Sequence, residues 1–314
     1  MNTNNKINKV LGNYYFLMYF KKINNNIFTI RKINDIEHYH EQTLMKQIAT
    51  ISIRNASLIQ VDDLSDFHSI KITNCKHLQK GNKITNVKEV NLSNNKKLEY
   101  LDTLANIQNV KLTNCETLFF IRHLENIQEA DFSDCKKLNS FHSMRNIKYL
   151  NLSNCECITN GILELFDNIE EVNLSYCKKI SNVEPLKNMK KINLKKCIKV
   201  TNVNALENVH TLNLEGCVNL KDVSKLGKVH TLNLTRCENL IDVSALGQVY
   251  DLKLKDCTKI KDVSHLGKVH TLNLNNCWGI TDVSNLGYVH TLDVSWCMNV
   301  KDFSALKYNQ NLIM

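Results

Sequence analysis

The chain has 314 residues, a length that on its own is typical of two globular domains. It contains one proline and no Gly/Ser-rich stretch, so nothing marks a flexible linker between such domains. The formal net charge of +9 falls into two patches, +4 in residues 1–48 and +7 in residues 178–199, and not into one basic stripe.

Residues 1–48 lack the repeat that organises the rest of the chain and are rich in asparagine and aromatic residues. Their apolar run from Val10 to Phe20 is too short to span a bilayer, and no small-x-small motif follows it, which argues against a signal peptide. We expect this segment to form a helical cap over the first repeat. The alternative is a docking segment with a role of its own.

From residue 49 to residue 314 the sequence repeats about every 20 residues. Cysteine marks the repeat, and Asn95 fills the one position where cysteine is missing. A fixed period of this length predicts a solenoid, here of about 13 repeats that begin with a degenerate copy at Ile51, Ile53 and Ala56. The marking cysteines are Cys75, Cys115, Cys135, Cys155, Cys177, Cys197, Cys217, Cys237, Cys257, Cys277 and Cys297.

Residues 209–229 show the repeat most clearly. Leu212 and Leu214 alternate with Thr211 and Asn213, which predicts a short strand with its leucines on the buried face. Stacked copies then form a parallel sheet with strands roughly 4.8 Å apart. The apolar positions are Val209, Leu212, Leu214, Cys217, Leu220, Val223 and Leu226.

The rest of each repeat must turn the chain back. The text Asp-Val-Ser-x-Leu-Gly recurs, with Ser224 suited to cap a helix and Gly227 suited to a left-handed residue at its end. We therefore expect a short 3₁₀ or α turn in each repeat. Pro185 fits the first turn of such a helix, where its missing N–H has no partner.

The pattern L-x-x-L-x-L-x-x-C-x-x-L-x-x-V-x-x-L resembles that of the leucine-rich repeat family. The resemblance implies a curved parallel β-sheet on the concave side, with short 3₁₀ or α turns and loops on the convex side. The segment from Cys155 to Leu165 is similar to the cysteine-containing repeats of F-box proteins. Most other repeats resemble those of internalins, and blocks such as L-G-K-V-H-T-L-N-L resemble uncharacterised proteins of giant DNA viruses of the mimivirus kind.

The marking cysteines allow a metal or redox interpretation, but a structural one is favoured. Each occupies an inward position of the repeat, where free cysteine behaves as a small buried hydrophobe. Stacked thiols have parallel Cβ vectors, which is poor geometry for a disulfide. Because an oxidising compartment would scramble so many thiols, we expect an intracellular, reducing location: the cytoplasm, a host cytoplasm or a virion.

A second column consists of His210, His230, His270 and His290, with Tyr250 in its middle. Stacked imidazoles about one strand apart could share Zn²⁺. Recently copied repeats also duplicate exposed residues, and no carboxylate or cysteine column lies beside the histidines, so duplication is the favoured explanation. We predict neither a metal nor a cofactor.

The basic patch at residues 178–199 contains eight lysines and Glu184. Repeat register places Glu170 beside Lys190, Glu171 beside Lys191 and Glu215 beside Lys195, and opposite charges across strands quench the field. Lys178, Lys179, Lys187, Lys196 and Lys199 are left without an obvious partner. Nucleic acid is disfavoured, because only Tyr176 and Trp296 offer rings for base stacking.

The outward strand face is long and polar, which suits an extended partner. Its central column holds one polar side chain per repeat, and asparagine predominates there. Tyr176 and Trp296 follow their strands and interrupt this polar face as candidate interface anchors. The candidate partner-binding residues are Tyr176, Lys191, Asn193, Lys195, Lys196, Asn213, Asn233, Lys253, Asn273, Asp293 and Trp296.

These features predict a non-catalytic protein that binds an unknown protein partner through its concave face. No phosphate loop, nucleophile elbow or H-E-x-x-H motif supports an enzyme, and no segment predicts membrane insertion. The alternative is a substrate receptor or adaptor of a ubiquitin ligase, although residues 1–48 lack the Leu-Pro start of an F-box. The last repeat predicts a further role in weak self-association, because an uncovered sheet edge can pair with another chain.

Overall fold

The computed structural model describes residues 21–23, 27–30, 50–55, 60–61, 68–81, 84, 87–101, 104, 106–122, 124–141 and 144–314. The chain divides into two compact units, and each is described by itself. The first comprises Met1–Cys157 with Asp167–Ile169, and the second comprises Ile158–Phe166 with Glu170–Met314. Among the described residues, no helix is both long enough and apolar enough to cross a membrane.

The first unit contains one strand per repeat in a parallel sheet. These strands are β3 (Thr50–Arg54), β5 (Ser69–Thr73), β7 (Glu89–Asn91), β9 (Asn109–Lys111), β11 (Glu129–Asp131) and β13 (Tyr149–Asn151). Residues 1–48 add β2 (Ile27–Ile30), which pairs parallel with β3, and β1 (Lys21–Ile23), which pairs antiparallel with β2. The helical cap expected for residues 1–48 otherwise lies outside the described residues and stays a prediction.

On the turn side of the first unit, the structure differs from the expected 3₁₀ turns. Two-residue strands form a second parallel sheet there. Where the repeats of the second unit carry Asp or Asn, whose side chain accepts a backbone N–H two residues later, the repeats of this unit carry Lys80, Tyr100, Phe120 and Ser140. The strands are β4 (Gln60–Val61), β6 (Lys80–Gly81), β8 (Tyr100–Leu101), β10 (Phe120–Ile121) and β12 (Ser140–Phe141).

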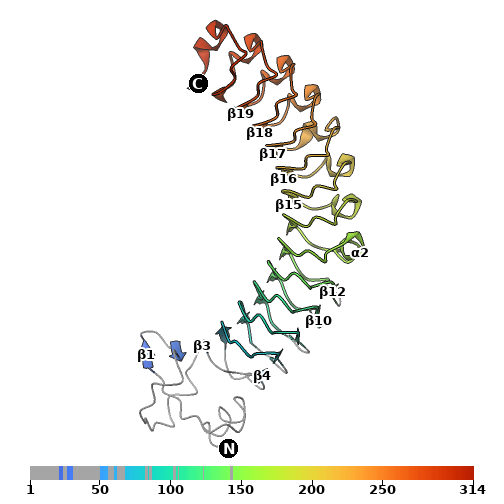
Figure 1. Ribbon diagram of the computed structural model, residues 1–314, viewed down its shortest axis with the longest axis vertical. Coiled ribbons are helices and arrows are strands. Elements are labelled where there is room, and N and C mark those ends of the chain that lie inside the picture. The colour runs from blue at the N-terminus through green and yellow to red at the C-terminus, as the bar shows by residue number, and fades with distance from the viewer. Residues whose placement is uncertain are drawn as a thin grey trace, which may run out of the picture. The chain divides into compact units, whose positions relative to one another are not determined.

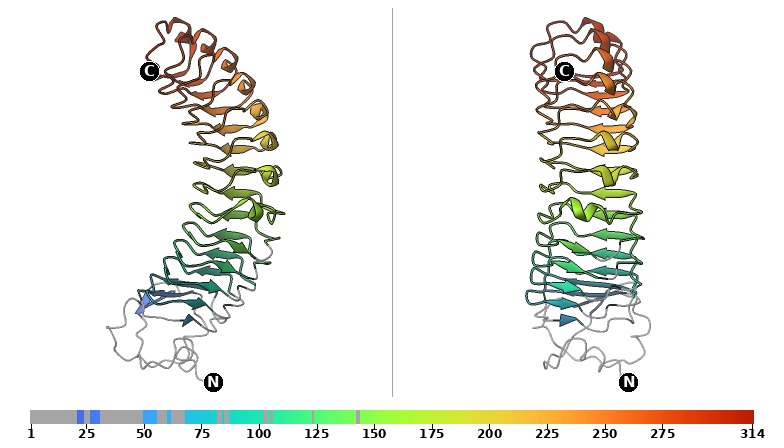
Figure 2. Two further views of the ribbon diagram at one scale, coloured as in Figure 1. Left: turned by 45° about the vertical axis from the view of Figure 1, so that its right-hand side comes forward. Right: turned by 90° about the vertical axis from the view of Figure 1, so that its right-hand side faces the viewer.

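The second unit stacks one strand and one short helical turn per repeat (Figure 1; Figure 2). Its strands pair in parallel with a shift of one repeat, as in Thr211↔Thr231. They are β14 (Glu171–Asn173), β15 (Lys191–Asn193), β16 (Thr211–Asn213), β17 (Thr231–Asn233), β18 (Asp251–Lys253), β19 (Thr271–Asn273), β20 (Thr291–Asp293) and β21 (Asn311–Ile313). Including β21, the strands confirm the predicted repeats of mostly 20 residues.

The turns of the second unit are the expected short helices. One is an α-helix, α2 (Asn160–Leu163), which lies in the lengthened repeat between Cys155 and Cys177. The others are 3₁₀ helices: η2 (Glu184–Leu186), η3 (Asn204–Leu206), η4 (Leu226–Lys228), η5 (Ser244–Leu246), η6 (Ser264–Leu266), η7 (Ser284–Leu286) and η8 (Ser304–Tyr308). Pro185 lies in the first turn of η2, as predicted.

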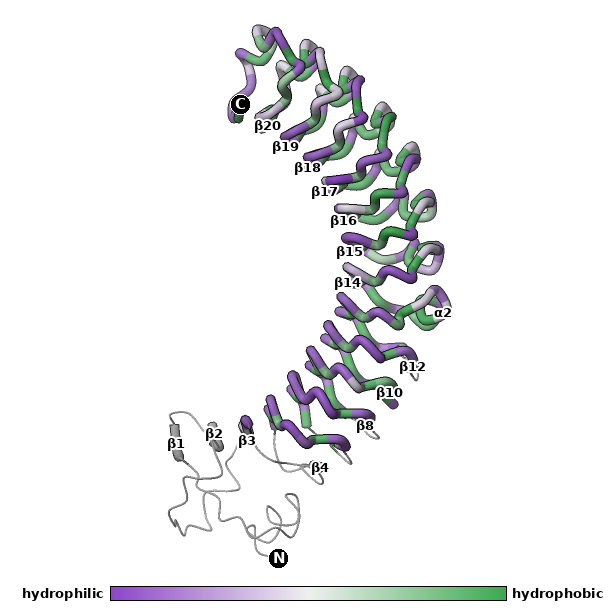
Figure 3. Tube along the Cα trace, in the orientation of Figure 1, coloured by the Kyte–Doolittle hydropathy of each residue, from purple (hydrophilic) through white to green (hydrophobic). Residues whose placement is uncertain are grey.

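The core is a column of apolar side chains between the strands and the turns. Leu212, Leu214, Leu220 and Leu226 are at most 1% exposed, and the same positions are buried in the neighbouring repeats. Hydrophobic and hydrophilic residues alternate around each coil of the second unit (Figure 3). Each repeat therefore buries its apolar side only against its neighbours.

The marking cysteines are buried, as predicted, but they also form hydrogen bonds. The Cys217 Sγ donates to the carbonyl oxygen of Leu194, 23 residues earlier, at 3.2 Å. Nine thiols share this geometry with distances of 3.0 to 3.3 Å: those of Cys115, Cys135, Cys155, Cys197, Cys217, Cys237, Cys257, Cys277 and Cys297. The position thus selects a small side chain that can donate a hydrogen bond to the preceding repeat.

Asn95 shows what the cysteine position requires. It is fully buried, and its Nδ2 donates to the carbonyl oxygens of Ile72 at 2.8 Å and Leu92 at 2.7 Å. Its Oδ1 accepts the backbone N–H of Cys75 at 2.8 Å. Asparagine therefore replaces cysteine here because every polar atom of its amide finds a partner in the stack.

Two details of the turns were predicted wrongly. Serine does not cap the 3₁₀ helices: Ser244 is the first residue of η5, and the N-cap residue is Val243. The Asp242 Oδ1, one residue before Val243, accepts the backbone N–H of Ser244 at 2.8 Å. This hydrogen bond holds the pKa of the Asp242 carboxyl below its ordinary value. The same contact recurs at Asp222, Asp262, Asp282 and Asp302.

The glycines that end these turns are not left-handed. Gly247 has φ −62° and Gly267 has φ −62°, which any residue can adopt. A Cβ on Gly247 would meet the carbonyl oxygen of His265, in the next repeat, at 2.3 Å. Glycine at position 247 therefore allows successive turns to pack backbone against backbone, whereas Lys187 and Glu207 hold the corresponding position after η2 and η3.

Burial predicts that the marking cysteines resist thiol reagents. Burial raises the pKa of the Cys217 thiol to about 12, so at pH 8 only about one molecule in 10⁴ carries the reactive thiolate. Cys157 is half-exposed and should react first. We expect a chromogenic disulfide reagent to titrate one or two thiols in the native protein and all twelve after denaturation in guanidinium. Rapid native reaction of six or more would show that the stack opens.

Candidate interaction surface

The central column of the strand face has a structural role in the second unit. The Asn193 Oδ1 accepts the backbone N–H of Lys195, two residues later, at 3.0 Å. This contact fixes the backbone where each strand ends, and it leaves the amide N–H₂ group directed elsewhere. The same contact, at 3.0 Å, is made by Asn213, Asn233, Asn273 and Asp293.

Three predicted ion pairs are present. Nitrogen–oxygen distances are 2.6 Å for Lys190–Glu170, 3.4 Å for Lys191–Glu171 and 2.9 Å for Lys195–Glu215. Exposed pairs of this kind contribute at most about 1 kcal/mol each, so they order side chains more than they stabilise the fold.

Two lysines that were expected to lack partners have them. The Lys187 Nζ lies 3.0 Å from the carboxylate of Glu184, and these two residues are the C-cap and the first residue of η2. The Lys196 Nζ lies over the Tyr176 ring, 5.6 Å from its centroid. Repeat register did not predict the first contact, because both residues belong to the same turn. It did not predict the second, because only carboxylates were considered as partners of lysine. Lys178, Lys179 and Lys199 are exposed on the same unit.

The residue before each marking cysteine has a left-handed backbone. In the second unit its φ lies between +57° and +70°. Its N–H still bonds to the next repeat, as in Lys196 N–H to the carbonyl oxygen of Glu215 at 2.7 Å. It thereby turns the chain from the strand toward the buried cysteine. We call these residues the exit-loop row: Tyr176, Lys196, Gly216, Arg236, Asp256, Asn276 and Trp296.

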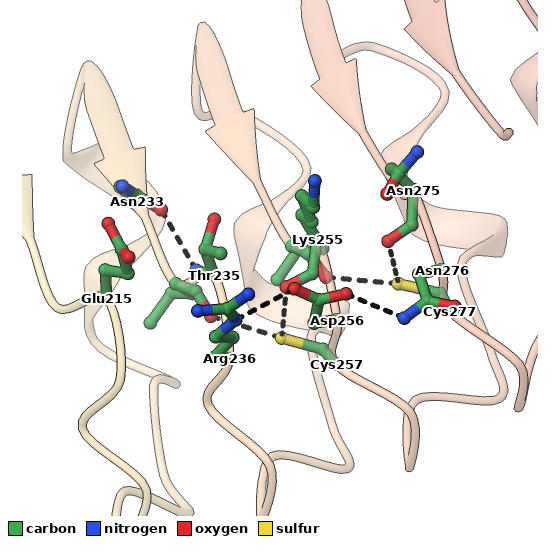
Figure 4. Close-up of polar contacts among 12 residues, drawn as sticks. Glu215, Asn233, Thr235, Arg236, Lys255, Asp256, Cys257, Asn275, Asn276 and Cys277 are labelled. Atoms are coloured by element: carbon green, nitrogen blue, oxygen red, sulfur yellow. Dashed lines mark hydrogen bonds and ion pairs between the residues drawn. The ribbon is translucent and has the colours of Figure 1, made fainter. Parts of the chain in front are cut away.

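Side chains of the exit-loop row contact one another from repeat to repeat. The Arg236 Nε donates to the Asp256 Oδ2 at 3.0 Å, and the Asn276 Nδ2 donates to the Asp256 Oδ1 at 2.7 Å (Figure 4). Burial opposes ionisation of Asp256, but these two hydrogen bonds and the guanidinium charge hold the pKa of its carboxyl below its ordinary value. The network fixes Arg236 and Asp256 at the edge of the strand face.

Large apolar side chains are exposed in the last repeats. Trp296 is 67% exposed, Trp278 is 52% exposed and Met298 is 71% exposed. Trp278 and Met298 each follow a marking cysteine directly. Sequence reasoning named Trp296 and missed Trp278, although the chain has only two tryptophans and each is next to a marking cysteine.

The second unit contains all of the candidate partner-binding residues. Tyr176, Lys196 and Trp296 lie in the exit-loop row, while Lys191 and Lys195 are held in ion pairs. The central column holds Asn193, Asn213, Asn233, Lys253, Asn273 and Asp293. Contact with a partner stays a prediction for every one of them.

Comparison with solved structures decides the fold. Internalin InlF of Listeria monocytogenes is 14% identical, with TM-score 0.50 and coverage of 90% of each chain. This chain has a leucine-rich repeat fold. The functional domain of InlJ from Listeria monocytogenes, described as including a cysteine ladder, has 16% identity, TM-score 0.32 and coverage of 80% of this chain and 68% of InlJ.

A leucine-rich repeat protein from Bacteroides ovatus has 10% identity and TM-score 0.31, and the match covers 96% of this chain and 100% of that one. No family model and no curated protein matches the sequence. At these identities the likeness concerns the fold alone. The resemblance to giant-virus proteins stays a prediction.

The histidine column of the leucine-rich repeats is an aromatic stack. His210, His230, Tyr250, His270 and His290 have neighbouring ring centroids 4.4 to 4.8 Å apart and interplanar angles of 10° to 18°. Each histidine Nδ1 lies 3.1 to 3.3 Å from the Oγ1 of the following threonine. In the described part of the chain, no three His, Cys, Asp or Glu side chains are grouped to hold a metal ion.

Ring stacking predicts that an inner histidine contributes more than an outer one. His230 stacks on His210 and Tyr250, whereas His210 has one ring neighbour. With about 0.5 kcal/mol for each exposed ring pair, His230→Ala should lower the free energy of unfolding by about 1 kcal/mol and His210→Ala by about half as much. Urea denaturation followed by circular dichroism measures both. Equal effects would show that stacking is not the source.

Proposed function

We propose that this leucine-rich repeat protein is a non-catalytic scaffold that binds a partner protein through the strand face of its second unit and the adjoining exit-loop row. One observation carries the proposal: both tryptophans of the chain are more than half exposed, and each follows a strand of the polar face, Trp278 after β19 and Trp296 after β20. A tryptophan left in water forgoes a large gain from burial, and exposed aromatic residues are typical anchors of protein interfaces.

Order in the surrounding polar side chains supports the same function. The central column is bonded to its own backbone, and the lysines beside it are held in ion pairs. A surface that is already ordered loses little side-chain entropy when a partner binds. An enzyme is not favoured, because catalysis needs a group of residues that breaks the repeat pattern.

Other interpretations stay predictions. The role as a substrate receptor or adaptor of a ubiquitin ligase depends on the likeness of one repeat to those of F-box proteins. An intracellular location depends on the number of thiols. Nucleic-acid binding and weak self-association through the last repeat are alternative uses of the second unit, and the described contacts favour neither over a protein partner.

Site-specific photo-crosslinking tests the proposal. A benzophenone amino acid replaces Asn213 on the strand face, and in a matched control it replaces Ala245, which is exposed on the turn side. In an extract of the cells that naturally contain the protein, we expect covalent adducts at position 213 that protease destroys and nuclease does not. The control should give few. Equal adducts at both positions, or adducts that nuclease removes, would contradict it.

A further inference from the structure

The last five repeats are close copies of one another, so the few positions at which their surfaces differ can be identified. The strand text V-H-T-L-N-L recurs unchanged at residues 209–214, 229–234 and 269–274. The exit-loop row instead differs in every copy, from Gly216 through Arg236, Asp256 and Asn276 to Trp296. Some exposed turn positions also differ, so variation alone does not identify a binding surface.

Backbone conformation separates the exit-loop row from the turns. The left-handed region favours Gly, Asn and Asp, and a bulky residue there is strained. In the first unit the corresponding positions are all Asn or Asp: Asn55, Asn74, Asn94, Asn114, Asp134 and Asn154. The second unit places Tyr176, Lys196, Arg236 and Trp296 in the same conformation.

The left-handed backbone disfavours these four residues relative to asparagine. Strain that persists where a relaxed residue is available points to a requirement other than folding. What the four have in common is a long side chain with an aromatic ring or a positive charge, and tryptophan, tyrosine and arginine are the residues that most often dominate binding energies.

The charges of the row define its complement. Its first end is basic, with Lys196 over Tyr176 and with Lys178, Lys179 and Lys199 exposed nearby. Its far end is apolar: it carries the exposed Trp296, and the exposed Trp278 and Met298 lie in the same last repeats. Between them, Asp256 neutralises Arg236. A uniformly anionic chain such as a nucleic acid would therefore gain little attraction from Arg236.

Repeat spacing gives the length of the complement. Five repeat steps separate Lys196 from Trp296, or about 24 Å at roughly 4.8 Å for each strand. An extended polypeptide covers that distance with about seven residues. In a bound polypeptide, an acidic group at the basic end of the row and an apolar side chain at the tryptophans would therefore lie about seven residues apart.

We propose that the exit-loop row from Tyr176 to Trp296 binds an extended polypeptide segment that is acidic at one end and carries a large apolar side chain about seven residues away. This inference rests on the protein-binding function proposed above and specifies its partner. The strand face then orders the row, and the row selects the partner.

Selection of peptides provides the test. A displayed library of random peptides of about 16 residues, long enough to cover the row, is selected on the purified full chain. We expect enriched peptides to combine two or more acidic residues with an aromatic or long aliphatic residue at the stated spacing. Binding should change the fluorescence of the two tryptophans, and replacing glutamate by glutamine in the peptide should weaken it at least tenfold.

Variants that remove strain test the surface. Tyr176→Asn, Lys196→Asn and Trp296→Asn place at each site the residue that the first unit carries there. Each should weaken peptide binding at least tenfold while the thermal midpoint stays equal or rises, so loss of folding cannot explain the result. Ala245→Asn, on the turn side, is the matched control and should change the dissociation constant less than twofold.

Four outcomes would overturn the inference. If Asn233→Ala on the strand face weakens peptide binding and the three row variants do not, the proposed function stands and the inference about the exit-loop row fails. The same holds if no peptide is enriched while photo-crosslinking at position 213 captures a protein. If neither experiment yields a partner, both proposals fail. Tight binding of a single-stranded oligothymidylate that displaces the peptides would assign the row to nucleic acid.

Discussion

The structure depends on one hydrogen bond that joins each repeat to the repeat before it. The side chain before the turn, cysteine in most copies, donates to a carbonyl oxygen 23 residues earlier, as Cys217 does to Leu194. In a solenoid each repeat contacts only its neighbours, so a contact that recurs in successive repeats acts along the stack of each unit. Burial raises the pKa of the Cys217 thiol to about 12, and the donor proton is therefore retained at ordinary pH.

This bond also explains the backbone around it. The chain must leave the strand and turn inward by one residue to bring the donor to the carbonyl, and a left-handed residue makes that turn while its N–H stays in the ladder. The inward side chain is then fixed, and the left-handed side chain is forced outward. Core and surface are thus set by adjacent residues with opposite requirements.

Regular stacking places identical outward positions about one strand apart, which turns single residues into rows. Opposite charges then pair, as in Lys191–Glu171, and rings stack, as in His270–His290. Such rows arise from duplication and need no ligand. The exit-loop row differs from these rows in two ways. Its residues vary from copy to copy, and four of them have a left-handed backbone that is unfavourable for their residue type.

Period and alternation sufficed to predict the strands, their parallel stacking, the buried cysteines and three ion pairs, because these depend on residues one repeat apart. The turn glycines were assigned wrongly, because Gly247 is limited by a carbonyl of the next repeat that local propensity does not contain. Serine was expected as the N-cap residue because it suits such a position, but Val243 is the N-cap of η5, and Asp242 accepts the Ser244 N–H. The left-handed row had a signal in the recurring asparagines at 74, 94, 114 and 154, whereas the contact of Arg236 with Asp256 depends on side-chain geometry.

The most direct test of the account compares two small replacements of one buried thiol. Cys217→Ala removes the donor, and Cys217→Ser keeps a donor within reach of the Leu194 carbonyl. If the hydrogen bond joins the repeats, the serine variant should have a free energy of unfolding in urea equal to or higher than that of the alanine variant. If cysteine serves only as a small apolar side chain, burial of an unpartnered hydroxyl should make the serine variant less stable than the alanine variant by about 1–3 kcal/mol, which would contradict the account.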